Sequence, residues 1–268
     1  KTRYMMKFLF ARMSEPTLPS WNHQGTKWQE SDDLQEQTWK HLWHWHLGAQ
    51  NDEGQDTPSE TIAELTDLVG SDQEVVGIQA AHKLGSLGKK GLAPLIEATI
   101  GNDPVTCRNA IYGFSRMGQL AVPSLVDLLS HDQAEVRARA ADTLCDLGLK
   151  AKFSLPALIE CLSDQNDKVR HHAAEAIGTI APDQDIAVEP LTKALTDEVD
   201  LVRRNATLSL AKIGQRATQA VSALTEALTD PDHLVRGFSV QALERNGTPQ
   251  AMPTLLDHLR TARWCPTH

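Results

Sequence analysis

A chain of 268 residues is long enough to bury a sizeable core, but only 5% of its residues are aromatic and 41% are hydrophobic, which disfavours a large globular enzyme. The formal net charge of −9 argues against a nucleic-acid partner, because binding to a polyanion relies on clustered Lys and Arg. No stretch reaches the roughly 18 apolar residues that a membrane-spanning helix needs, so we expect a soluble, cytoplasmic protein that binds neither membranes nor nucleic acids.

The first twelve residues, Lys1 to Arg12, alternate in a pattern typical of a β-strand. A single strand needs partner strands that this chain does not supply, so we expect the chain to be a piece of a longer protein. The run from Arg3 to Phe10, followed by Glu15-Pro16-Thr17, resembles the last jelly-roll strand and exit segment of the phytanoyl-CoA dioxygenase-like family of iron and 2-oxoglutarate oxygenases. The resemblance covers about twenty residues and none of that family's metal-binding motif. It implies that this chain is the C-terminal appendage of an oxygenase.

Residues 1–60 differ in composition from the rest of the chain. They hold five of the six tryptophans and four histidines, namely Trp21, Trp28, Trp39, Trp43, Trp45, His23, His41, His44 and His46. The stretch from Asp32 to Leu47 predicts an amphipathic helix that caps the following domain. The polar stretch from Gln50 to Pro58 predicts a linker. We therefore expect residues 1–60 to be an irregular N-terminal segment and residues 61–268 to be a separate domain.

The histidines of this segment raise the question of a metal site. Imidazoles about one helical turn apart can share an ion, and His41, His44 and His46 approach that spacing. No carboxylate-histidine motif of a known metal class accompanies them, so the pattern favours a helix without a metal. We expect the protein to bind no stoichiometric iron or zinc and no other cofactor.

Beyond this segment the sequence repeats with a period of 33 residues. The dipeptide Val-Arg occurs at Val136-Arg137, Val169-Arg170, Val202-Arg203 and Val235-Arg236, and an aspartate precedes each one, at Asp132, Asp164, Asp197 and Asp230. In each unit a shorter apolar segment precedes a longer one. The longer segment has the 3.6-residue period of a buried helix stripe, as at Val169, Ala173, Ala176 and Ile177. Each unit is therefore predicted to be one antiparallel helix pair.

Glycine and proline predict where these helices end and begin. Glycines fall where the longer helices must stop, at Gly85, Gly118, Gly148, Gly214 and Gly247, and prolines fall in the first turn of the shorter helices, at Pro94, Pro123, Pro156, Pro190 and Pro253. Shorter helices should begin near Thr61, Leu92, Ala121, Ser154, Ala187, Thr218 and Gln250, and longer ones near Gln73, Asp103, Gln133, Asp167, Val199 and Asp232. A lone pair would expose apolar surface on both sides, so the units must stack. The predicted fold is an all-α, right-handed α-α superhelix of six helix pairs and a terminal half repeat.

These signatures resemble HEAT repeats of the short bacterial kind, similar to those of phycobiliprotein bilin lyases. The resemblance covers about 200 residues and is specific for the fold. It implies that the repeated aspartates and arginines pair between adjacent units as a structural ladder. The implied members are Asp132, Arg137, Asp164, Arg170, Asp197, Arg203, Asp230 and Arg236.

The fold leaves the function open, because such solenoids host many unrelated activities. Deoxyhypusine hydroxylase, a HEAT-repeat enzyme, holds two irons with several His-Glu pairs placed after the Val-Arg position. One unit comes near this pattern, with His171, His172 and Glu175, and the others do not match. No nucleophile with a base and no Gly-rich phosphate loop is recognisable. The sequence favours a non-catalytic protein-interaction scaffold; the alternatives are the oxygenase appendage and, third, a bilin-lyase-like chromophore-binding protein.

A protein-binding face is expected on the longer helices, at positions two, five and nine residues after each ladder arginine. These positions lie away from the apolar stripe, so stacking should align them in rows on one concave face. The rows are Arg139, Asp142 and Asp146; His172, Glu175 and Thr179; Asn205, Leu208 and Lys212; and Phe238, Gln241 and Arg245. Leu208 and Phe238 are apolar at positions that packing within one repeat leaves exposed, so they either anchor a protein partner or pack only on neighbouring helices.

Overall fold

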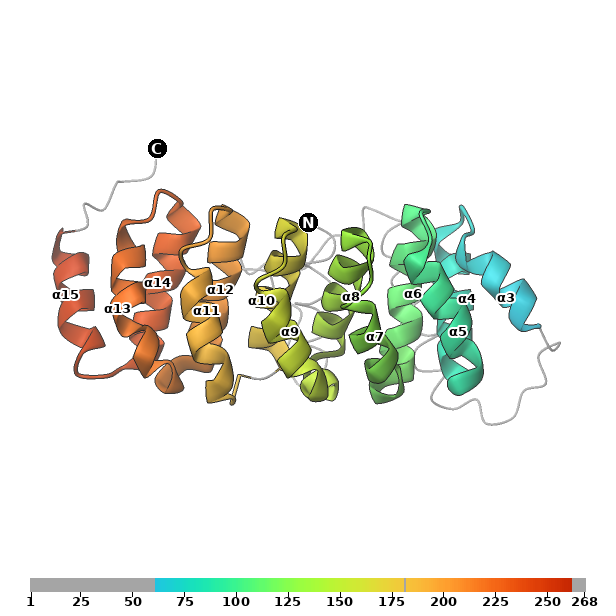
Figure 1. Cartoon of the computed structure of the whole chain (residues 1–268), viewed down its shortest axis with the longest axis horizontal. Coiled ribbons are helices and arrows are strands. Elements are labelled where there is room, and N and C mark those ends of the chain that lie inside the picture. The colour runs from blue at the N-terminus through green and yellow to red at the C-terminus, as the bar shows by residue number, and fades with distance from the viewer. Residues whose placement is uncertain (1–60, 181, 262–268) are drawn as a thin grey trace, which may run out of the picture. The chain divides into compact units, whose positions relative to one another are not determined.

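The structure is a computed structural model that describes residues 61–180 and 182–261, and every regular element in these two ranges is a helix (Figure 1). The α-helices are α3 (Ile62–Val69), α4 (Glu74–Ser86), α5 (Lys89–Ile100), α6 (Pro104–Met117), α7 (Val122–Leu128), α8 (Ala134–Leu147), α9 (Leu155–Cys161), α10 (Asp167–Ile180), α11 (Val188–Ala194), α12 (Asp200–Ile213), α13 (Val221–Glu226), α14 (His233–Asn246) and α15 (Ala251–Thr261). The all-α solenoid is confirmed. The predicted N-terminal strand, Trp-rich cap and linker lie outside the described residues, and the division of the chain at residue 60 stays a prediction.

The described helices form six successive pairs and a final helix, as the repeat pattern predicts. Within each pair the second helix packs against its own first helix, and the second helices α4, α6, α8, α10, α12 and α14 pack on one another in series. The first pair begins at Thr61, whose hydroxyl accepts a hydrogen bond from the N–H of Glu64 while its own N–H donates to the Glu64 carboxylate. This capping box satisfies two N–H groups that have no partner inside the helix. None of the described helices combines the length and apolar character that crossing a membrane requires.

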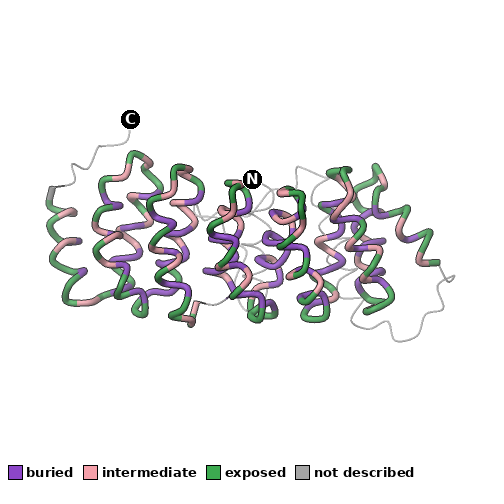
Figure 2. The backbone as a smooth tube through the Cα atoms, viewed as in Figure 1, coloured by how far each residue is buried: buried purple, intermediate pink, exposed green. Residues whose placement is uncertain are grey.

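The core lies between the two layers of helices and continues along the stack (Figure 2). It consists mainly of Ala, Leu and Val, and the valine of each Val-Arg dipeptide is fully buried, at Val136, Val169, Val202 and Val235. Small side chains at these positions let neighbouring helices approach closely. The core therefore depends on many modest contacts between repeats instead of on a few large aromatic groups.

Four of the five predicted helix-stopping glycines have a positive φ, between 58° and 65°, at Gly118, Gly148, Gly214 and Gly247. The prediction for Gly85 was wrong, since α4 continues to Ser86 and the positive φ falls on Gly88. Gly85 instead allows close packing. A Cβ atom there would lie 2.2 Å from the carbonyl oxygen of Gly113 in α6, so the two helices touch through their backbones.

The early turn at Gly88 also changes the next helix. Helix α5 begins at Lys89, three residues before the predicted start near Leu92, and Pro94 consequently lies inside the helix and not in its first turn. The N–H groups of the first turn have no acceptor inside the helix, which is why proline is tolerated there. At Pro94 the helix has lost one internal hydrogen bond.

Candidate functional site

Three arginines of the Val-Arg dipeptides form bidentate ion pairs with aspartates of the following helix pair. Arg137 contacts Asp164 through Nε and Nη2, at 2.7 and 2.8 Å. The same two contacts join Arg170 to Asp197, at 2.7 and 2.9 Å, and Arg203 to Asp230, at 2.8 and 3.0 Å. Each arginine also donates from Nη1 to two carbonyl oxygens of the turn before its own helix. One side chain thus connects two consecutive turns.

The remaining two members of the predicted ladder, Arg236 and Asp132, do not form such an ion pair in the described part of the chain. Arg236 donates to the carbonyl oxygens of Asp230 and Pro231, at 2.8 and 3.0 Å, but among the described residues it has no carboxylate partner. Asp132 contributes its backbone carbonyl to Arg137, at 3.0 Å. Arg236 therefore makes the hydrogen bonds to the backbone that the other ladder arginines make, but not the ion pair.

A further pairing between adjacent repeats was missed by the sequence analysis. Arg204 follows the ladder arginine directly, and its Nε donates to Asp232 at 2.9 Å across to the next pair. It also contacts Asp200 one turn earlier on its own helix. The repeat pattern contains no second arginine at this position in the other units, so periodicity could not have revealed it.

The ion pairs of the ladder predict that the folded protein loses stability at acidic pH. The guanidinium of Arg137 lowers the pKa of Asp164 below its usual value. Burial alone would raise the pKa of Asp197 and Asp230, but hydrogen bonds from Arg170 and Arg203 outweigh it, and both pKa values are lowered. A carboxylate with a lowered pKa in the folded state contributes stability above its unfolded pKa, near about 3.9, and that stability is lost as the pH falls through the lower folded value.

We therefore expect the urea midpoint of unfolding to be nearly constant between neutral pH and about pH 5 and to fall steeply below about pH 4. Denaturation curves followed by circular dichroism at a series of pH values test this. A midpoint that did not change down to about pH 2 would show that the three aspartates contribute nothing to stability.

The rows predicted as a protein-binding face are occupied largely by contacts between repeats. Arg139 donates to the carbonyl oxygens of Thr99 and Gly101, both at 2.8 Å. Lys212 donates to the Thr179 hydroxyl at 2.9 Å, an interaction between neighbouring long helices. Similar links join Asn205 to α10 and Arg245 to α12. These polar groups stabilise the stack and are only partly available to a ligand.

The two apolar residues of that face are not fully exposed. Leu208 and Phe238 are both half-buried, and Asp142 is buried with 8% of its surface exposed. Their partial burial agrees with the alternative of packing on neighbouring helices, and a role in partner binding stays a prediction. In a solenoid the next helix also covers part of each long helix.

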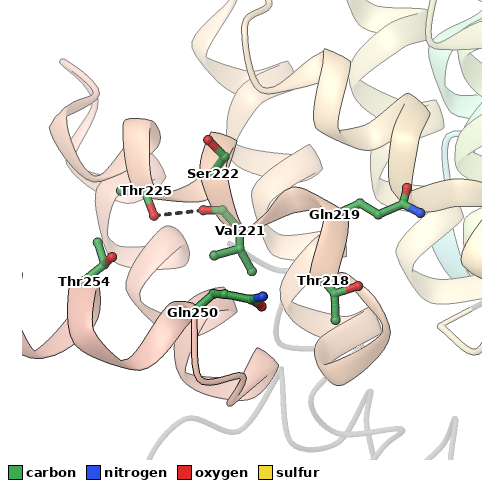
Figure 3. Close-up of a pocket in the computed structure, with 7 residues that line it drawn as sticks. All are labelled: Thr218, Gln219, Val221, Ser222, Thr225, Gln250 and Thr254. Carbon is green, nitrogen blue, oxygen red and sulfur yellow. Dashed lines mark hydrogen bonds between the residues drawn. The ribbon is translucent and has the colours of Figure 1, made fainter.

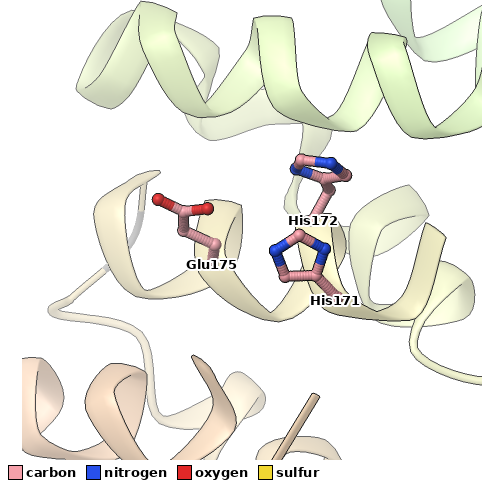
Figure 4. A group of neighbouring side chains, drawn as sticks. All are labelled: His171, His172 and Glu175. Carbon is pink, nitrogen blue, oxygen red and sulfur yellow. The ribbon is translucent and has the colours of Figure 1, made fainter. Parts of the chain in front are cut away.

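One unusual cluster on α10 includes two members of these rows, His172 and Glu175, together with the adjacent His171. His171, His172 and Glu175 are half-buried, and their ligand-type atoms lie within 4.8 Å of one another (Figure 4). The two imidazole ring centres are 4.2 Å apart. Burial lowers the pKa of His171, and the neighbouring His172 adds to this effect. From α8, Asp142 places an Oδ1 atom 3.7 Å from Nδ1 of His172.

A regularly spaced set of exposed apolar side chains lies instead on the connections between helix pairs. Leu87, Leu120, Phe153 and Ile186 follow one another at intervals of 33 residues, and each lies two residues before a short helix begins. Their exposed fractions are 42, 40, 80 and 64%. Four equivalent positions in consecutive repeats are therefore apolar and open to solvent. We call these four residues the apolar edge.

The connections that carry the apolar edge lie against one another in order along the stack. A terminal methyl of Leu120 would lie 3.7 Å from a Cβ atom added to Gly88, and the Lys150 side chain lies against Gly118 in the same way. Further along, Lys152 pairs with Asp183 at 2.9 Å. The side chains of consecutive connections thus form one strip of surface along the solenoid.

The charge of this strip is opposite to that of the chain as a whole. Its two carboxylates, Asp183 and Asp185, are paired with Lys152 and Arg216, at 2.9 and 3.4 Å. Three further exposed lysines lie on these connections or at the start of the helix that follows, and they have no ion-pair partner among the described residues; they are Lys150 on its connection and Lys89 and Lys90 at the start of α5. A net positive strip with apolar side chains therefore runs along an acidic protein.

A shallow groove of about 550 Å³ lies near the C-terminal end, between α15 and the connection that leads into α13 (Figure 3). Its lining is uncharged and consists of Thr218, Gln219, Val221, Ser222, Thr225, Gln250 and Thr254. The hydroxyl of Thr225 is already bonded to the carbonyl oxygen of Val221, at 2.8 Å. The groove offers hydrogen-bonding groups but no acid, base or thiol.

A family model described as HEAT repeats matches residues 122–211 and 188–264, which together make up more than half of the chain. The chain belongs to the HEAT-repeat family. A search of curated proteins finds no match. These comparisons give no support to the resemblance of the first twenty residues to the dioxygenase-like family.

Solved structures show the same HEAT-like architecture. The complex of CpcE and CpcF of phycocyanin lyase from Nostoc sp. PCC7120 matches 56% of this chain and 96% of its own, with 23% identity and a TM-score of 0.51. A designed armadillo repeat protein in complex with the peptide (KR)4 matches 70% of this chain and 100% of its own, with 20% identity and a TM-score of 0.50. At these sequence identities, the similarity shows a shared fold but not a shared function.

The thiols of the HEAT repeats are packing groups. Cys107, Cys145 and Cys161 are buried and are not in disulfides. Burial raises the pKa of Cys161 to about 11 and also raises that of Cys107. The thiolate is the reactive form of cysteine, so neither of these two side chains is an active nucleophile at neutral pH.

Proposed function

We propose that this chain is a non-catalytic scaffold that binds a protein partner along the apolar edge. The observation that carries the proposal is the repetition of one exposed apolar side chain at the same position of four consecutive repeats. Exposed apolar side chains scattered singly are ordinary, whereas their recurrence at one position of four consecutive repeats supports a contact surface. The HEAT-repeat fold supports this role, since a solenoid offers a long surface made of equivalent positions.

The partner that fits this surface is an acidic segment with regularly spaced apolar side chains. Neighbouring helices pack about 8 to 10 Å apart, so members of the apolar edge repeat at about that interval. A helix brings residues i and i+7 to a similar spacing, about 10.5 Å. The unpaired lysines of the strip favour carboxylates beside the apolar positions. Phe153 and Ile186 are the most exposed members and would be the central anchors.

Charge-introducing substitutions at these anchors test the proposal. We expect the double variant Phe153→Glu, Ile186→Glu to lower the affinity for the partner by at least about tenfold, or about 1.4 kcal/mol. Stability should change by no more than about 0.5 kcal/mol, because both side chains are exposed on connections between helices. Proteins retained by the wild-type chain on a column, and then measured individually, provide the binding partners.

Leu201→Glu, Leu234→Glu is the matched control, since both leucines are exposed on the first turns of α12 and α14, at 46 and 38%, and lie outside the apolar edge. The control should bind like the wild type. Equal binding by all three proteins would exclude the apolar edge as the docking surface. The designed armadillo protein, whose bound peptide alternates lysine and arginine, illustrates peptide binding by a related fold with the opposite partner charge.

A further inference from the structure

The His-His-Glu cluster on α10 is not used by the proposed scaffold function, because it lies on a long helix and not on the connections that carry the apolar edge. We infer that His171, His172 and Glu175 form a binding site for one divalent transition-metal ion such as Zn²⁺. The inference rests on the types of the three side chains, their separation and the charge around them.

The ligand set suits a borderline ion. Two imidazoles and one carboxylate are typical of sites for zinc, iron and related divalent ions, and atypical of sites for calcium or magnesium, which prefer oxygen ligands. Glu175 lies four residues after His171 and three after His172, and both spacings place it one helical turn away on the same side. Figure 4 shows the three side chains leaving the same stretch of α10.

The distances require only a small adjustment. Metal bonds to imidazole and carboxylate are about 2.0 to 2.2 Å long, so two ligands of one ion lie at most roughly 4.3 Å apart. The candidate ligand atoms lie within 4.8 Å of one another. Rotation about the side-chain bonds of the three residues covers a difference of that size without any change in the helix.

The surroundings favour a cation. Apart from His172, the charged groups that act on His171 are all carboxylates, from Glu175, Asp142 and Asp167. Asp142 belongs to the preceding long helix and lies 3.7 Å from Nδ1 of His172. A carboxylate behind a ligating histidine fixes the orientation of its ring and strengthens the ligand. Partial burial of all three side chains reduces competition from water.

The number of ligands indicates what the ion could do. Zinc in structural sites has four protein ligands, whereas sites with three keep a position for water or another ligand. The cluster supplies three, and α8 supplies Asp142 beside them. The ion would therefore be connected to the adjacent repeat through the contact between His172 and Asp142. Its fourth coordination position would remain for water or another ligand.

The experiment uses the full chain carrying His23→Gln, His41→Gln, His44→Gln and His46→Gln, so that the N-terminal histidines cannot contribute. Zn²⁺ is titrated calorimetrically, and Co²⁺ is titrated as a spectroscopic probe of coordination. We expect one ion per chain and a Co²⁺ spectrum of low-symmetry nitrogen and oxygen ligation. His171→Gln and Glu175→Gln, each added separately, should weaken binding by at least about tenfold.

His233→Gln is the control, because His233 is an exposed histidine at the start of α14. It should leave the affinity unchanged, and circular dichroism establishes that each variant is folded. Absence of a one-to-one ion in the background chain would overturn the inference, as would equal affinity in the folded His171→Gln and Glu175→Gln variants. The Phe153→Glu, Ile186→Glu change should not alter metal binding, so the outcome is independent of the scaffold proposal.

Discussion

Replacing Gly178 by alanine is expected to destabilise the solenoid by about 3 kcal/mol, because the new methyl group has no space. Gly178 lies in α10 where that helix crosses α12, and an added Cβ would lie 2.5 Å from Cβ and 2.6 Å from Cα of Ser209. The contact is with the backbone of a neighbouring helix, so rotation of a side chain cannot relieve it. The Ser209 hydroxyl also donates to the carbonyl oxygen of Ala174, at 2.6 Å, and separation of the helices would break this hydrogen bond.

Gly237→Ala is the matched control for this substitution. Gly237 also lies inside a long helix, α14, but nothing lies within 4 Å of its added Cβ. Alanine has the better helix propensity, so Gly237→Ala should stabilise the protein by about 0.5 to 1 kcal/mol. Urea denaturation of the two variants measures both effects. Changes of the same sign would show that the close approach of α10 and α12 is not a constraint on the stack.

Arg170→Ala should cost about 2 to 3 kcal/mol, because the substitution leaves polar groups of two consecutive turns without their donor. Both partners of the ion pair are largely shielded from water, with 11% of each side chain exposed. Asp197 would keep its hydrogen bond from the N–H of Val199 but lose two charged ones. An exposed ion pair would contribute far less, typically below about 1 kcal/mol.

Arg236→Ala measures what the ion pair adds to the backbone contacts. Arg236 makes the same two hydrogen bonds to carbonyl oxygens as Arg170, without a carboxylate partner among the described residues. Its loss should therefore cost about 1 kcal/mol. Equal urea midpoints for the two variants would contradict the structural ladder, since the difference between them is attributed to Asp197.

The fold could be predicted from the sequence because it is repeated. A single Val-Arg dipeptide would carry little information, but four at equal spacing establish both the buried position and the turn before it. The helix ends followed from Gly118, Gly148, Gly214 and Gly247, where the backbone requires a residue that tolerates positive φ. The same rule failed at Gly85 because a glycine can also be required by close helix packing, and spacing does not distinguish the two causes.

The surface was harder to predict, because exposure depends on neighbours that are far away in the sequence. Leu208 and Phe238 were expected to be exposed from their own helices, but adjacent repeats cover part of them. Leu87, Leu120, Phe153 and Ile186 have a 33-residue spacing that is visible in the sequence. The signal was missed because apolar residues near a predicted helix start read as part of the core.

The His-His-Glu cluster was set aside for a different reason. The sequence comparison required matching histidines and glutamates in several repeats, a condition for a centre with two ions. A site for one ion needs only the side chains of one helical turn and its immediate surroundings. The structure brings Asp142 of the preceding repeat, which stands at the repeat position equivalent to Glu175, to 3.7 Å from His172.

Site-specific photo-cross-linking from the apolar edge tests the central claim most directly. A photoreactive phenylalanine analogue at position 153 would be compared with the same analogue at position 201, an exposed leucine outside the edge. We expect position 153 to cross-link to a protein segment that is rich in acidic residues, and position 201 to give no cross-link to that segment. Cross-linking of the same partner with equal yield from both positions, or from position 201 alone, would contradict the proposal that this HEAT solenoid binds its partner along the apolar edge.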